Sequence, residues 1–394
     1  MNSQTSSLKL SLFALAMGGF SIGLTEFVMM GILPDVAKAL NISIPKAGDL
    51  ISVYAAGVVV GAPILAGGTA KYSPKSVVKW LMVAFFFFHL LSTFSPNFEV
   101  LFISRFLSGL PHGAFFGVAA VIASRLAKEG KKASAIATVF FGLTIANVIG
   151  VPLGTYLGHH FSWRYSFFLV VISSAITALL IWKFVPKLEG TKETNFKQDL
   201  KVLKKPELLL VVAITSIGTG GFFAWLSYIA PMLIEVTKVS PDKIPTVMIL
   251  VGIGMSCGNI LGGKISDAYS PKYSILILLS LIVTLLIINH FIAQYMIPSL
   301  ILSFLMGTFA LALASPIQML LINLSKEAEV LGSSLGQSSF NIGNALGAFL
   351  GGIPLTLGHS QTSPALVGAC LALTGVSLTC IFIWYQQNLK TIAQ

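Results

Sequence analysis

Long apolar stretches recur along the whole chain and constrain its fold more than any other feature. The first, Leu12–Leu33, would form a helix of about 30 Å, which matches the hydrocarbon core of a bilayer. Of the 394 residues, 55% are hydrophobic and only 10% are charged, as in polytopic membrane proteins. Glycine, proline and Ser-Pro pairs separate the stretches. The sequence therefore predicts an all-α protein with twelve transmembrane helices, at about 11–33, 48–69, 76–94, 99–123, 133–158, 164–185, 208–230, 245–266, 273–293, 298–322, 331–357 and 364–386.

The lysines and arginines are divided unequally between the two sets of alternate loops. Nineteen of the 25 fall in the termini and the loops on the same side, and five fall in the opposite loops. Because positive loops face the cytoplasm, both termini are expected there. The net charge of +11 is then a topology signal, and no nucleic-acid partner is expected.

The second half of the chain repeats the first at an offset of 197 residues. The sequence YSPK at Tyr72–Lys75 recurs at Tyr269–Lys272, and Gly57 and Gly61 match Gly254 and Gly258. Six spans separate the copies, so the halves are parallel repeats, which place a substrate between them near the midplane. The predicted organisation is a cytoplasmic N-terminus at 1–10, a six-helix bundle at 11–185, a cytoplasmic linker at 186–206, a second bundle at 207–387 and a cytoplasmic tail at 388–394. A short amphipathic helix could form near 196–203 of the linker.

Two charged residues, Glu26 and Arg105, lie well away from the ends of their predicted spans, where ionisable groups are costly and usually functional. Glu26 lies about 12 Å of helix from Pro34, and Arg105 lies about 9 Å from Glu99, both measured from the outer side. They are therefore expected at similar depth, with Arg105 as a partner for Glu26. The offset of 197 places Phe223 and Leu302 at the equivalent positions. The fold does not need these charges, which favours a proton-handling role for the first half.

Several motifs resemble those of the major facilitator superfamily. Gly263–Lys272 (GKISDAYSPK) is similar to its cytoplasmic loop signature, while the first-half copy has Ala70 where the acid belongs. The run Arg105–Gly113 is similar to its intramembrane R-x-x-x-G-x-x-x-G pattern. The run Gly142–Gly158 of the fifth span resembles, in a shortened form, the glycine/proline motif of its antiporters. Together with the runs around Thr25-Glu26-Phe27 and Phe223–Tyr228, these motifs resemble the arabinose-efflux branch of the bacterial drug:proton antiporters, next to the sugar-efflux transporters.

The resemblance implies roles for specific residues. Arg105 would take part in proton coupling with Glu26, and the loop residues Asp267, Lys71, Lys75 and Lys272 would latch an inner gate. Glycines four residues apart would line a seam between the halves, although ordinary tight helix packing explains them nearly as well. These interface glycines are Gly57, Gly61, Gly150, Gly154, Gly254, Gly258, Gly347 and Gly351.

Other polar groups inside spans are candidates for a substrate cavity. Amides offer both donors and acceptors, which suits neutral polar molecules, and aromatic rings can stack on a sugar or a ring. Each could equally form a hydrogen bond between helices, and for a lone histidine that is the favoured interpretation. The candidates are Tyr54, His112, Asn147, Trp225, Tyr228, Gln318, Gln337, Asn341 and Asn344.

No catalytic, nucleotide-binding or metal-binding motif is present, so an enzyme, a cofactor and ATP drive are not expected. Three cysteines in apolar segments do not suggest disulfides. We expect a monomeric, proton-coupled exporter of a small sugar-like or amphipathic drug-like molecule in a bacterial cytoplasmic membrane, working by alternating access in the lipid bilayer. The alternatives are a proton-coupled uptake symporter and, in a different class, a receptor or a lipid scramblase.

Overall fold

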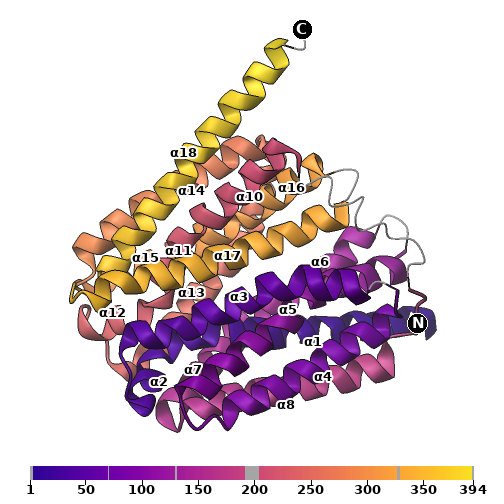
Figure 1. Ribbon diagram of the computed structural model, residues 1–394, viewed down its shortest axis with the longest axis horizontal. Coiled ribbons are helices and arrows are strands. Elements are labelled where there is room, and N and C mark those ends of the chain that lie inside the picture. The colour runs from indigo at the N-terminus through magenta and orange to yellow at the C-terminus, as the bar shows by residue number, and fades with distance from the viewer. Residues whose placement is uncertain (1–2, 70, 129–130, 191–203, 326–328, 393–394) are drawn as a thin grey trace. The chain divides into compact units, whose positions relative to one another are not determined.

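The computed structural model describes residues 3–69, 71–128, 131–190, 204–325 and 329–392, and every regular element in these ranges is a helix (Figure 1). The first half contains α1 (Ser3–Gly31), α2 (Leu33–Leu40), α3 (Ile44–Thr69), α4 (Pro74–Thr93), α5 (Phe98–Leu126), α6 (Lys132–Ile145), the π-helix η1 (Ala146–Gly150), α7 (Val151–His160) and α8 (Trp163–Phe184). The second half contains α10 (Pro206–Gly218), α11 (Gly220–Ser227), α12 (Ile229–Glu235), the 3-10 helix η3 (Pro241–Lys243), α13 (Ile244–Ala268), α14 (Pro271–Ile292), α15 (Met296–Ala312), α16 (Ala314–Leu324), α17 (Glu329–Thr356) and α18 (Ser363–Ile392).

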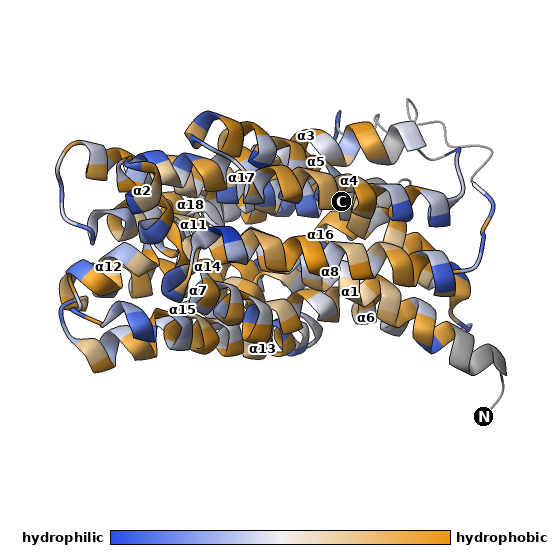
Figure 2. Ribbon diagram, turned by 90° about the horizontal axis from the view of Figure 1, so that it is seen from below, coloured by the Kyte–Doolittle hydropathy of each residue, from blue (hydrophilic) through white to orange (hydrophobic). Residues whose placement is uncertain are grey.

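Eleven helical stretches in the described ranges are long and apolar enough to cross a bilayer. The predicted span at 331–357 corresponds to α17, which is not among these eleven. Figure 2 shows hydrophobic residues along the helices and hydrophilic residues near helix ends and in connections. Helices suit a bilayer because they satisfy their own backbone hydrogen bonds. The prediction of an all-α polytopic membrane protein is confirmed, and the side on which the termini lie stays a prediction.

Contacts between Cα atoms divide the chain into two compact units. Unit 1 takes Met1–Ile42, Val53–Thr194 and Ile244–Ile249, and unit 2 takes Ser43–Ser52, Asn195–Lys243 and Leu250–Gln394. Within unit 1, α1 packs on α6 and α8, and α4 packs on α5 and α8. Within unit 2, α14 packs on α18, and α11 packs on α17 and α18. The predicted domain boundaries stay a prediction, and the amphipathic helix expected near 196–203 lies outside the described residues.

The repeated YSPK turn has the same structural role in both units. In unit 1 the turn leads into the start of α4, with Ser73 at the N-cap and proline in the first turn. In unit 2 it leads into the start of α14, with Ser270 at the N-cap. Proline suits this position because its missing N–H would have no partner in the first turn. The turn chemistry read from the sequence therefore corresponds to two helix starts.

The interface glycines pack against helices of their own unit. A Cβ at Gly57 or Gly61 of α3 would overlap the carbonyl oxygen of Phe106 or Leu110 in α5. The repeated pair Gly254 and Gly258 of α13 would meet the carbonyl oxygens of Phe304 and Thr308 in α15, Gly150 and Gly154 lie against α1, and Gly347 and Gly351 lie against α11. Close helix approach within each unit, the ordinary packing explanation, accounts for these contacts. A role at a seam between the halves stays a prediction.

Three of the predicted spans are interrupted helices. The fifth contains the π-helix η1 between α6 and α7, the seventh is divided at Thr219 and Tyr228 into α10, α11 and α12, and the tenth is divided at Leu313. A π-helical turn inside an α-helix is rare and frequently accompanies a functional position. In unit 1 that turn contains Asn147, one of the predicted cavity residues.

A buried charged cluster as the candidate functional site

Glu26 of α1 and Arg105 of α5 lie together in the interior of unit 1. Glu26 is 7% exposed and Arg105 is fully buried. The two charges interact electrostatically, but among the described residues the direct ion pairs are Lys46–Asp49 and His159–Asp35. Glu26 is therefore influenced by the guanidinium without being neutralised by a direct contact.

Arg105 is held by a hydroxyl group and by aromatic rings. Its Nη1 donates to Thr25 Oγ1 at 2.8 Å, and the Thr25 carbonyl oxygen lies 3.5 Å from the same nitrogen. The guanidinium carbon lies 4.1 Å from the ring centroid of Tyr54 and 5.7 Å from that of Phe167. A planar, delocalised cation stacks on aromatic faces in a way that an ammonium group does not. These contacts fix the cation beside α1.

Tyr54 and His112, both predicted cavity residues, belong to the same cluster. The Tyr54 hydroxyl lies 3.1 Å from His112 Nδ1, and both side chains are almost fully buried. Tyr54 interacts electrostatically with both Glu26 and Arg105. The ring of His112 also packs edge-on against Phe116. The structure therefore places these two residues next to the charged pair, hydrogen-bonded to each other.

Two members of the cluster, Thr25 and His89, were not predicted as site residues. Thr25 Oγ1 lies 2.7 Å from His89 Nε2, and His89 Nδ1 lies 2.8 Å from the carbonyl oxygen of Phe85. All of these atoms come from α1 and α4, two helices whose mutual orientation a sequence does not reveal. The sequence signal for His89 was a histidine directly after the apolar run Phe85–Phe88 of a predicted span.

The predicted cavity residues of unit 2 contain buried polar atoms that lack partners. Asn344 is fully buried, and neither its Oδ1 nor its Nδ2 has a hydrogen-bond partner among the described residues. Asn341 Oδ1 and Trp225 Nε1 are also buried without a hydrogen-bond partner there. Asn341 Nδ2 donates to the carbonyl oxygen of Gln337 at 3.0 Å. A buried polar atom without a partner costs about 1–3 kcal/mol, so hydrogen-bonding partners would be favoured at these atoms.

The other predicted cavity residues are placed differently. The Tyr228 hydroxyl donates to the carbonyl oxygen of Ala348 at 2.7 Å, which ties the break between α11 and α12 to α17. Gln318 and Gln337 are partly exposed, and Gln318 lies beside Gly336 of α17. Asn147 is buried within η1.

The predicted gate residues lie at helix ends. Lys71 is exposed and Lys75 is partly buried. Lys272 donates to Gln386 at 3.1 Å, beside a pocket of about 530 Å³ that Glu207 and Asn323 also line. Asp267 belongs to α13, but its side chain lies outside the described part of the chain. The latch stays a prediction.

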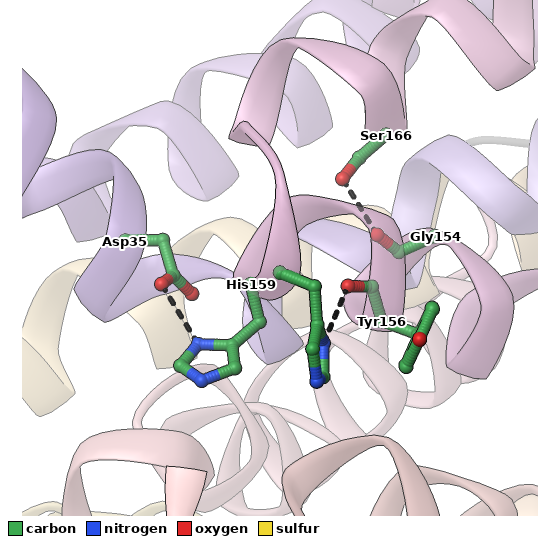
Figure 3. Close-up of polar contacts among 6 residues, drawn as sticks. Asp35, Gly154, Tyr156, His159 and Ser166 are labelled. Carbon is green, nitrogen blue, oxygen red and sulfur yellow. Dashed lines mark hydrogen bonds and ion pairs between the residues drawn. The ribbon is translucent and has the colours of Figure 1, made fainter. Parts of the chain in front are cut away.

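A second pair of titratable groups lies at the other end of unit 1. Asp35 of α2 contacts His159 of α7, with Oδ1 and Nδ1 separated by 3.0 Å, and Figure 3 shows this contact beside the Ser166 hydroxyl, which donates to the carbonyl oxygen of Gly154 at 2.7 Å. Burial raises the pKa of the Asp35 carboxyl from its ordinary value of 3.8, and the hydrogen bond from His159 opposes that rise. The pair joins α2 to the end of α7.

Replacing Asp35 is expected to change how stability depends on pH. Because its pKa is raised in the folded state, Asp35 contributes most to the free energy of unfolding below pH 3.8, and this contribution is lost as the pH rises through the raised value. Relative to wild type, Asp35→Asn should therefore become more stable as the pH increases over that range. Unfolding of the purified protein across pH measures this, with the exposed Asp242→Asn as control. A difference between Asp35→Asn and wild type that is independent of pH would contradict the expectation.

The comparisons with known proteins decide the family. A model described as Major Facilitator Superfamily matches residues 15–336 and, in a second match, 226–391. This chain belongs to the major facilitator superfamily. The transporter is 38% identical over 381 residues to the "Putative transporter AraJ" of Escherichia coli (strain K12), with 97% of both chains covered. The resemblance read from the sequence motifs is thereby confirmed.

Other relatives and a solved structure agree with this assignment. The transporter is 36% identical to the "Inner membrane transport protein YdhP" of Escherichia coli (strain K12), with 97% of each chain covered. It is 28% identical to a "Probable sugar efflux transporter" of Helicobacter pylori (strain G27), covering 86% of this chain and 87% of that one. A bacterial homologue of the human lysosomal transporter Spinster superposes with a TM-score of 0.68 over 95% of both chains, at 14% identity, and shows the same fold.

Proposed function

We propose that this major facilitator protein is a proton-coupled exporter that carries a small sugar-like or amphipathic drug-like molecule by alternating access across a bacterial cytoplasmic membrane. The observation that carries the proposal is the placement of Glu26, a buried acid that interacts electrostatically with the fixed guanidinium of Arg105. A carboxyl group in such surroundings can exchange a proton when its access to water changes.

Coupling needs only a modest change at one carboxyl group. A proton that moves down the membrane potential supplies about 2.3 kcal/mol per 100 mV. A tenfold change in proton affinity between the outward-open and inward-open states corresponds to about 1.4 kcal/mol. Glu26 would take up a proton from the outside and release it inside, and the fixed charge of Arg105 would supply the field that substrate binding alters. The coupling ion is the proton, and no further cofactor is required.

Unit 2 would supply the contacts for a neutral substrate. Its buried amides on α17 and the indole of Trp225 offer unpaired donors and acceptors. The name of one relative, the "Probable sugar efflux transporter" of Helicobacter pylori, points towards sugars and towards export, which is the basis for preferring an exporter over an uptake symporter. Membership of a transporter family makes a receptor or scramblase role the weaker alternative.

A pH gradient across sealed proteoliposomes tests this function. L-arabinose, lactose and ethidium serve as probes, and a probe that exchanges in vesicles without a gradient is chosen. We expect its accumulation to follow the imposed gradient and to collapse when a protonophore is added. Exchange of the probe that is unaffected by the gradient would overturn proton coupling, and accumulation together with protons would favour the symporter.

A further inference from the structure

A directional chain of hydrogen bonds runs through the charged cluster of unit 1. Arg105 Nη1 donates to Thr25 Oγ1 at 2.8 Å, because a guanidinium has no acceptor. At the other end, His89 Nδ1 lies 2.8 Å from the carbonyl oxygen of Phe85, which can only accept. His89 Nδ1 therefore carries a proton and donates it.

These two ends determine the contact in the middle. With the proton on Nδ1, the neutral imidazole of His89 has a lone pair on Nε2, and Thr25 Oγ1 lies 2.7 Å from it. The Thr25 hydroxyl can then donate to His89 while its oxygen accepts from Arg105. If Nε2 also carried a proton, the hydroxyl would have to turn away from His89, and no acceptor for it is found among the described residues.

We propose that His89 is a positioning residue for the proton-coupling site: it orients the Thr25 hydroxyl, and Thr25 in turn holds the Arg105 guanidinium beside Glu26. The inference rests on the proposed function and assigns to α4 a part in it. The imidazole is itself held in place, because its ring centroid lies 4.2 Å from that of Phe85 and 6.4 Å from that of Phe167, whose ring also faces Arg105.

The internal repeat provides an independent argument that these hydrogen bonds are not needed for folding. At the offset of 197, unit 2 has Phe222 in place of Thr25, Leu286 in place of His89 and Leu302 in place of Arg105. All three are buried, so the same positions pack well with apolar side chains. Tyr54 and His112 are likewise replaced, by Val251 and Phe309. A set of buried polar groups that only one repeat retains is better explained by function than by folding.

Two substitutions at one position separate the two bonds of His89. In His89→Gln, the amide oxygen can take the place of Nε2 and accept from Thr25. In His89→Asn, the shorter side chain can take the place of Nδ1 and donate to Phe85, but it does not reach Thr25. Thr25→Ser and Thr25→Val form the matched pair on α1, since serine keeps the hydroxyl and valine keeps the shape without it.

The test compares accumulation driven by a pH gradient with downhill exchange in proteoliposomes, using whichever of L-arabinose, lactose and ethidium the wild type exchanges. We expect His89→Asn and Thr25→Val to lower accumulation at least about tenfold, the factor that corresponds to about 1.4 kcal/mol. Downhill exchange should stay near that of wild type. His89→Gln and Thr25→Ser should retain most of the accumulation.

Nitrogen NMR of the protein carrying isotope-labelled histidine provides a readout that needs no substrate. The signal assigned to His89, identified by its loss in His89→Gln, should show one protonated and one unprotonated ring nitrogen. A doubly protonated ring, equal accumulation in His89→Asn and wild type, or parallel loss of accumulation and exchange in every variant would overturn the positioning role. If Glu26→Gln retains accumulation, the proposed function itself fails, whereas loss in Glu26→Gln with normal transport in His89→Asn rejects only this inference.

Discussion

Glu26→Gln is expected to abolish accumulation of the substrate against its gradient while leaving downhill exchange in place. Glutamine keeps the size and the hydrogen-bonding capacity of the side chain but cannot bind and release a proton. Because glutamine has nearly the same shape as glutamate, the neutral amide should also fit this position, which is 7% exposed. The measurement is the ratio of internal to external probe in proteoliposomes with and without a pH gradient, and in the variant this ratio should fall to one.

The matched control for this substitution is Glu99→Gln. Glu99 lies in the first turn of the same helix as Arg105, α5, and is exposed. Loss of its charge should leave accumulation unchanged, because no proton is carried there. Uphill transport that persists in Glu26→Gln would remove Glu26 from the coupling role, and equal loss in both variants would show a general effect of carboxylate removal.

Leucine in place of Gly57 is expected to have the largest effect on stability. A Cβ at this position would overlap the backbone carbonyl oxygen of Phe106, and a backbone atom in a packed helix cannot move aside as a side chain can. Overpacking of this kind costs about 1–3 kcal/mol or more, so the yield of folded protein and its melting temperature in detergent should fall. Gly254→Leu should behave in the same way, because the repeat places it against the carbonyl oxygen of Phe304.

Each of these glycines has a control on its own helix. At Gly68 of α3 and Gly263 of α13, an added Cβ would meet no heavy atom of the described residues within 4 Å, apart from the chain neighbours and the helix's own backbone. Leucine at either control position should be neutral or slightly stabilising, because it favours helix more than glycine does. A melting temperature of Gly57→Leu equal to that of Gly68→Leu would contradict the close approach of α3 and α5.

The spans and the internal repeat could be predicted because both depend on local chemistry. A bilayer requires helices of a certain length, and the repeated Ser-Pro turns determine where α4 and α14 begin. The stripes of small residues could also be identified in the sequence. The helix that each stripe contacts could not be identified, because helix pairing depends on long-range packing.

The candidate site could be predicted only in part, for the same reason. Glu26 and Arg105 were identifiable because a charge inside an apolar stretch is costly wherever it points. Thr25 and His89 are ordinary helix residues in sequence, and their importance comes from a hydrogen bond between α1 and α4. The π-helix around Asn147 lies just before Pro152, which was visible in the sequence, but the sequence alone did not specify a π-helical turn there.

Proton movement itself is the most direct test of the central claim that Glu26 couples transport to protons. A pH-sensitive dye is sealed inside proteoliposomes, and the probe that exchanges downhill is added outside. As the probe enters through wild-type protein, an antiporter moves protons out, so the lumen should become alkaline, and Glu26→Gln should show probe entry without this change. An unchanged lumenal pH during wild-type exchange, or the same alkalinisation in Glu26→Gln, would contradict the account.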